Sequence, residues 1–199
     1  LYLAHGPSVR TSAALAGTLL GVAVTGAVGW VAIGRARLTG RVLTDTTSIV
    51  LDLTGMRVTK ASVNGRKVRF TARGKKLRLT TEPLVRNQPV RIDIAYAGNP
   101  QPAIGTWGDI GWEELEDGVL VAGQLIGASA WFPCNDQPSN KAKFRITVLT
   151  ESEYTVVSNG ELTDKVRKAG RTAWTYRSTT PLATYLATVQ IGRYRQGPI

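Results

Sequence analysis

The chain has 199 residues, of which 43% are hydrophobic and 20% are charged, and it carries a formal net charge of +11. This balance excludes a disordered chain and is sufficient for one domain with a sizeable core. Because Cys134 is the only cysteine, an intramolecular disulfide is excluded, and the composition fits a reducing, cytoplasmic location. With His5 as the only histidine, a zinc site built from two histidines is also excluded.

The N-terminal segment, residues 1–34, has an unusual composition. No residue from Ser12 to Gly34 is charged, and this stretch is long enough to cross a membrane as a helix. Gly17 and Gly21 have the G-x-x-x-G spacing that brings membrane helices together. The many Gly, Ala and Thr residues nevertheless make the stretch only moderately apolar, and glycine is a poor helix former. Two interpretations remain, a disrupted first strand, which would expose a sheet edge, and a membrane anchor, which is not favoured.

From Arg35 onward the hydrophobic pattern has a period of two, which is typical of half-buried β-strands. The clearest alternating runs are residues 35–42, 48–53, 90–96 and 144–148. Asn64-Gly65 supplies two residues that tolerate positive φ in a tight hairpin turn. No segment after residue 35 has a convincing helical period. We therefore predict an all-β domain over residues 35–199, a twisted antiparallel two-sheet sandwich.

Residues 104–118 are rich in glycine and read as a loop. They contain an acidic cluster made of Glu113, Glu114, Glu116 and Asp117. Carboxylates can ligate a hard cation, but this cluster lacks the spacing of a calcium-binding loop. We expect these acids to solvate a hairpin turn, and we predict neither a metal site nor catalytic residues in the chain.

Lys and Arg dominate residues 57–91, where Glu82 is the only acidic residue. Such a basic segment can attract nucleic acid or an anionic membrane. Phe70 is its only aromatic residue, so it lacks the stacking platforms used by single-strand binders. We interpret the segment as a solvated sheet face and predict no nucleic-acid partner.

The most informative stretch runs from Trp131 to Phe144. It contains Pro133-Cys134-Asn135-Asp136-Gln137-Pro138, followed by Lys141-Ala142. This run resembles the Pro-Cys-x-Asp-x-Pro-x-x-Lys-Ala segment in the amino-terminal domain of the aminopeptidase-N family of zinc metallopeptidases, of the gluzincin type and actinobacterial branch. Further matches, in the same order, are residues 49–58 and 63–65, Tyr96-Ala97-Gly98-Asn99-Pro100, Gly111-Trp112 with Asp117-Gly118, and residues 181–194.

The resemblance implies one substrate-binding residue, Gln124. In the family, a Gln or Glu nine residues before the motif proline helps to hold the free α-amino group of the peptide, and counting back from Pro133 gives Gln124. An ammonium offers three donors, and an amide oxygen accepts one without the desolvation cost of a buried carboxylate. The alternative is a strand-end glutamine that bonds the backbone. Asn135 and Asp136 are expected to brace the turn through side-chain-to-backbone bonds, and Cys134 is expected to be a small buried filler.

The family holds its zinc with the two histidines of an H-E-x-x-H helix and a later glutamate, which this sequence lacks. The resemblance therefore implies a substrate-side domain of an enzyme that removes N-terminal residues from peptides. We expect a fragment without the catalytic zinc domain, with no cofactor of its own and no activity alone; its partners would be the N-terminus of a peptide substrate and that catalytic domain. Two departures are Leu125, where relatives usually have proline, and Gln137, where they usually have histidine. The alternative function is a membrane-tethered basic β-sandwich that acts as an interaction module.

Overall fold

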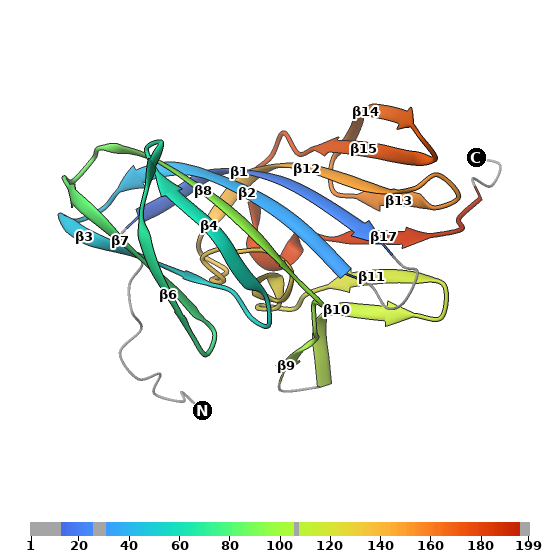
Figure 1. The fold of residues 1–199 in the computed structure, drawn as a ribbon, viewed down its shortest axis with the longest axis horizontal. Coiled ribbons are helices and arrows are strands. Elements are labelled where there is room, and N and C mark those ends of the chain that lie inside the picture. Colours follow the sequence, from blue (N-terminus) through green and yellow to red (C-terminus); the bar gives the residue numbers. More distant parts are fainter. Residues whose placement is uncertain (1–12, 26–30, 106–107, 196–199) are drawn as a thin grey trace.

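The computed structural model describes residues 13–25, 31–105 and 108–195. These residues form three β-sheets and two short 3-10 helices, which confirms the all-β prediction (Figure 1). The long strands curve side by side across the molecule, and the smaller sheets lie toward its two ends (Figure 1).

The largest sheet has nine strands. In spatial order these are β14 (Glu161–Lys168), β15 (Arg171–Arg177), β12 (Lys141–Glu151), β1 (Ala13–Thr25), β2 (Val31–Val42), β8 (Pro89–Gly98), β4 (Arg57–Val63) and β5 (Arg66–Lys67), with β16 (Leu182–Ala183) paired to β12. The five-stranded sheet contains β13 (Thr155–Ser158), β17 (Val189–Gly192), β11 (Gly118–Ala122), β10 (Gly108–Leu115) and β9 (Ala103–Gly105). The three-stranded sheet contains β3 (Thr46–Asp52), β7 (Lys76–Leu84) and β6 (Arg69–Arg73). The 3-10 helices are η1 (Ala128–Ala130) and η2 (Thr184–Leu186).

Both smaller sheets pack against the same face of the nine-stranded sheet. The alternation predicted from the sequence decides which face this is, because even-numbered residues of β2, β8 and β12 are buried and their odd-numbered neighbours are more exposed. Residues from all three sheets meet in one continuous core, which includes Leu38, Ile92 and Ile146 of the large sheet, Ile49 and Leu77 of the three-stranded sheet, and Val119 and Ile191 of the five-stranded sheet. The described residues leave the opposite face of the large sheet uncovered.

Asn64 and Gly65 form the predicted hairpin turn between β4 and β5. Their φ angles of 51° and 82° are both positive, as this kind of turn requires. The basic residues of segment 57–91 are exposed, as expected. They do not share one face, however, because they are divided between β4 and β5 of the large sheet and β6 and β7 of the three-stranded sheet.

The uncharged stretch forms β1, which lies in the interior of the nine-stranded sheet. β1 runs parallel to β12 and antiparallel to β2, and its register places Leu20 between Ile146 and Ala36. A first strand is therefore present, and the exposed edge expected from a displaced strand does not form at this position. Because β1 pairs in parallel with β12, the sandwich is antiparallel with one exception among the described pairs.

The membrane-anchor interpretation concerned the same segment. Among the described residues, no helix has the length and apolar character needed to cross a membrane. Residues 1–12 and 26–30, which also belong to the proposed N-terminal segment 1–34, lie outside the described residues, as does His5.

Residues 104–118 are not the loop that their glycines suggested. They contain the end of β9, all of β10 and the turn into β11. Glycine is tolerated here because the strand needs unusual backbone angles, for example φ 95° at Gly111. The hairpin of β10 and β11 thus contradicts the loop prediction and brings residues 111–115 beside residues 118–122.

Gly34 provides a test of the packing between β2 and β8. It pairs with Tyr96, which is buried, and a Cβ at Gly34 would lie 2.2 Å from Cζ of that ring. Overpacking a core costs about 1–3 kcal/mol, so we expect Gly34→Ala to lower the free energy of unfolding by roughly 2 kcal/mol. Urea denaturation measures this change.

Gly21 of β1 is the matched control for that experiment. A Cβ there would meet nothing within 4 Å, so Gly21→Ala is expected to leave the free energy of unfolding nearly unchanged. Equal stability of the two alanine variants would show that the buried ring does not occupy the space above Gly34.

Candidate functional site

Gln124 lies in the turn that connects β11 to η1. Its backbone N–H donates to the carbonyl oxygen of Ile126 at 3.1 Å, which closes a tight turn around Leu125. Leu125 has φ 65°, a left-handed conformation that costs a leucine energy and that a proline ring forbids. The leucine found in place of the usual proline therefore suits the turn that this chain builds.

The side chain of Gln124 is exposed and lines a cavity of about 350 Å³. Within the described residues its amide makes no hydrogen bond, in contrast to the strand-end alternative. The cavity is also lined by Pro102, by Trp112 and by two exposed acidic residues of β10, Asp109 and Glu113. The arrangement places an amide oxygen and two carboxylates, all of them hydrogen-bond acceptors, around one concave surface.

Asp109 and Glu113 were not predicted from the sequence to lie beside Gln124. The β10–β11 hairpin brings them together: Gly111 of β10 pairs with Ala122, the last residue of β11, and Asp109, Glu113 and Gln124 all line the cavity at this end of the hairpin. The turn of this hairpin is Glu116-Asp117, between Leu115 and its partner Gly118. The sequence predicts a hairpin turn at these acids, but the glycines upstream indicate a loop where the structure has β10, so Asp109 and Glu113 were not placed beside Gln124.

Close backbone packing supports this side of the cavity. A Cβ at Gly123 would lie 2.7 Å from the carbonyl oxygen of Tyr185, and a Cβ at Gly111 would lie 2.7 Å from that of Gly127. Any side chain at either position would force these segments apart. The turn with Gln124 is thus fixed against β10 on one side and against η2 on the other.

The carboxylate of Asp136 anchors the same turn through hydrogen bonds to its backbone. Its Oδ2 accepts hydrogen bonds from the backbone N–H of Gly127 at 3.0 Å and of Ser129 at 3.2 Å. Its Oδ1 accepts a hydrogen bond of 3.4 Å from the hydroxyl of Thr184. The sequence predicted that Asp136 braces its own turn through local bonds; its carboxylate instead braces a turn that lies seven to nine residues upstream.

The motif is in turn fixed to the three-stranded sheet through Asp52. The backbone N–H of Asp52 donates to the carbonyl oxygen of Cys134 at 2.7 Å, and the N–H of Cys134 donates back at 3.1 Å. The side chain of Asp52 accepts a hydrogen bond from the backbone N–H of Asp136 at 3.3 Å and forms an ion pair with Lys76 at 2.5 Å. Residues 131–136 therefore connect the turn of Gln124 to β3.

Cys134 has a structural role. It is buried next to the packed aromatic rings of the motif, among which Trp131 and Phe132 meet edge to face at 4.5 Å. Burial, followed by the nearby charges of Asp136 and Asp52, raises the pKa of its thiol well above the usual range. The thiol therefore stays protonated near neutral pH and is a poor nucleophile.

The described residues do not fit a zinc ion. No group of three or more His, Cys, Asp or Glu side chains in residues 13–25, 31–105 and 108–195 is placed to hold a metal. In the acidic cluster, Asp117 accepts a hydrogen bond from the hydroxyl of Tyr154 at 2.8 Å and pairs with Arg193 at 3.0 Å. Asp117 thus joins an exposed network of charges beside the turn.

Removal of the Asp136 carboxylate tests the anchor. Asp136→Ala leaves two backbone N–H groups without their acceptor, and each such group costs about 1–3 kcal/mol. We expect a loss of roughly 2–4 kcal/mol in the free energy of unfolding, measured by urea denaturation, and a smaller loss for Asp136→Asn, which keeps one acceptor oxygen. Asp164→Ala on the exposed strand β14 is the control, and an Asp136→Ala variant as stable as that control would contradict the anchor.

Comparisons with known proteins identify the domain. The model of the "Peptidase M1 N-terminal domain" family matches residues 31–186. Leucyl aminopeptidase from Saccharolobus solfataricus is 23% identical over 154 residues, which are 76% of this chain and 19% of that protein. Tricorn protease-interacting factor F2 from Thermoplasma acidophilum is 27% identical over 154 residues, again 76% of this chain and 19% of that protein. The chain therefore spans about a fifth of the length of these curated relatives.

Solved structures agree with this assignment. The crystal structure of an M1 zinc metallopeptidase from Deinococcus radiodurans superposes with a TM-score of 0.86 at 27% identity, and the match covers 92% of this chain and 42% of that one. A mutant of that enzyme bound to a Tyr-Ser-Ala substrate gives a TM-score of 0.86 at 26% identity, covering 91% of this chain and 42% of that one. Since the family model spans most of the sequence, this chain belongs to the peptidase M1 N-terminal domain family.

Proposed function

We propose that this domain forms the substrate side of a zinc-dependent aminopeptidase that removes N-terminal residues from peptides, and that Gln124 holds the α-ammonium group of the substrate. The observation that carries the proposal is the position of Gln124. Its amide is exposed, lacks a hydrogen-bond partner among the described residues, and lines a cavity together with Asp109 and Glu113.

The chemistry of this cavity suits a protonated amine. An ammonium has three N–H donors and no acceptor, so it needs a wall of oxygen atoms. The amide oxygen of Gln124 supplies one acceptor, and the two carboxylates add negative charge while remaining hydrated. A free N-terminus should therefore bind here in preference to a blocked one.

The relatives support a peptide substrate. The Deinococcus radiodurans enzyme was solved with a Tyr-Ser-Ala substrate, and one curated relative is named leucyl aminopeptidase. Because the described residues do not supply a zinc-ligand set, we infer that zinc is held by a catalytic domain outside this sequence. The buried free thiol of Cys134 fits the cytoplasmic location that we propose for the protein.

Exposed apolar side chains around the cavity support contact with that catalytic domain. Leu125 and Ile126, which flank Gln124, are 53% and 40% exposed, and Leu186 of η2 is 44% exposed. Ile104 of β9, which pairs with Asp109, is 80% exposed. Apolar side chains gathered around a polar cavity are typical of an interaction surface.

Recognition of the amine can be tested by NMR titration. We expect Ala-Ala-amide to shift the side-chain NH₂ signals of Gln124, whereas the N-acetylated peptide should not. A neutral hydrogen bond contributes about 0.5–1.5 kcal/mol, so Gln124→Ala should weaken binding roughly three- to tenfold. Gln190→Ala on β17, a strand outside the cavity, is the control; equal shifts from both peptides would rule out amine recognition.

The proposed need for a catalytic domain makes a second prediction. The purified 199-residue chain should not hydrolyse alanine 4-nitroanilide at any added zinc concentration, because its described residues form no zinc-ligand set. Hydrolysis followed by absorbance is the measurement. A turnover that co-purifies with the chain and disappears with a chelator would overturn this part of the proposal while leaving the NMR result intact.

A further inference from the structure

The uncovered face of the nine-stranded sheet contains a groove of about 520 Å³. One row of residues crosses it on five neighbouring strands, and strand pairing defines this row as Thr147, Gly21, Arg35, Ala95 and Lys60. Large polar residues alternate with small ones along the row. We call this feature the outer groove.

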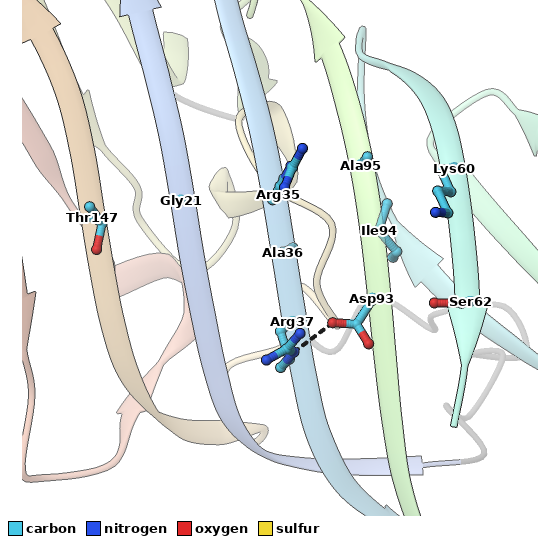
Figure 2. Close-up of a pocket in the computed structure, with 10 residues that line it drawn as sticks. All are labelled: Gly21, Arg35, Ala36, Arg37, Lys60, Ser62, Asp93, Ile94, Ala95 and Thr147. Carbon is cyan, nitrogen blue, oxygen red and sulfur yellow. Dashed lines mark hydrogen bonds and ion pairs between the residues drawn. The ribbon is translucent and has the colours of Figure 1, made fainter. Parts of the chain in front are cut away.

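Two cations face each other across a small residue in this row. Ala95 of β8 pairs with Arg35 on one side and with Lys60 on the other, and Figure 2 shows these two side chains on either side of β8. Neighbouring strands are about 4.8 Å apart, so the Cα atoms of Arg35 and Lys60 are about 10 Å apart. A carboxylate placed above the methyl group of Ala95 is within reach of both long side chains.

The acidic residue in the groove does not neutralise these cations. Asp93 pairs through Oδ1 with Arg37 at 2.5 Å and through Oδ2 with Arg91 at 3.1 Å (Figure 2 shows the first pair). Both of its oxygens are therefore engaged by other arginines. In the described part of the chain, Arg35 and Lys60 have no ion pair.

The floor of the groove is open because of Gly21. A Cβ at this position would meet nothing within 4 Å, so among the described residues the space directly above Gly21 is open between Thr147 and Arg35. The groove therefore continues sideways from the two cations across β1. This shape suits an extended ligand better than a single small ion.

We propose that the outer groove binds an acidic peptide segment, with one carboxylate held between Arg35 and Lys60 above Ala95. Charge complementarity favours such a partner, because the chain has a net charge of +11 and the groove carries cations without a partner among the described residues. None of the residues that line the groove is aromatic, so bases of a nucleic acid would find no stacking surface. The hydroxyl of Ser62 adds a neutral donor for peptide carbonyl groups.

Fluorescence anisotropy of a labelled hexa-aspartate peptide, titrated with the purified chain at about 20 mM salt to limit screening, tests the proposal. Arg35→Gln combined with Lys60→Gln should weaken binding about tenfold, since charge-assisted hydrogen bonds are lost. Arg73→Gln combined with Lys75→Gln removes the same charge from the exposed end of the β6–β7 hairpin and should change binding by less than about twofold.

Gly21→Leu separates shape from charge. The new side chain enters the empty space above β1 and leaves the net charge unchanged, so it should also weaken the peptide about tenfold if the ligand lies in the groove. If Gly21→Leu binds the peptide unchanged, or if the two double variants lose equal affinity, the peptide does not bind in the outer groove. An oligothymidylate or a phosphatidylserine vesicle is compared with unlabelled hexa-aspartate as a competitor, at equal concentrations of negative charge. If either displaces the labelled peptide more effectively than hexa-aspartate does, an acidic peptide is not the preferred ligand of the groove.

Discussion

The position of Gln124 depends on the carboxylate of Asp136. That carboxylate accepts the N–H groups of Gly127 and Ser129, which belong to the segment directly after Gln124. Through the backbone of the motif and the side chain of Asp52, the same carboxylate is connected to β3 in a different sheet. A loop would normally have its own mobility, but here two sheets and a charged acceptor fix it. A polar side chain can therefore face a cavity in a defined position.

The two faces of the large sheet have different roles. Its inner face packs against both smaller sheets in one core, and this packing sets the position of the β10–β11 hairpin and of the cavity beside Gln124. Its outer face has no cover in the described residues, and Arg35 and Lys60 project from it. The period of two thus assigns one set of residues to stability and leaves the other available for binding. The proposed amine site and the outer groove lie on different parts of the molecule, so each can be tested without disturbing the other.

The sequence predicted most of the sheet, and it proposed Gln124 as a site residue; this residue lines a cavity, and its role stays a prediction. Alternation located β2, β3, β8 and β12, Asn64-Gly65 located a hairpin, and the motif located Gln124 by counting from Pro133. Two features were missed for physical reasons. β1 consists of small and aliphatic residues without alternating polar ones, so its uncharged run could not be distinguished from a membrane segment until its pairing with β12 and β2 was known. In residues 104–118, glycines normally indicate loops, whereas here they allow strands to approach other backbones closely; the contribution of Asp109 and Glu113 was lost with that hairpin.

Amide hydrogen exchange at Gly127 and Ser129 tests whether Asp136 holds the turn of Gln124, because it reports the hydrogen bonds to Asp136 one by one. In the wild-type chain both amides should exchange slowly, in the manner of the amides within β12. In Asp136→Ala, which removes the acceptor of both N–H groups, they should exchange much faster while β12 keeps more of its protection, which would show that the anchor opens locally. Rapid exchange of Gly127 and Ser129 in the wild-type chain would show that Asp136 does not fix the turn of Gln124, and the proposed role of Gln124 would then lack its structural support.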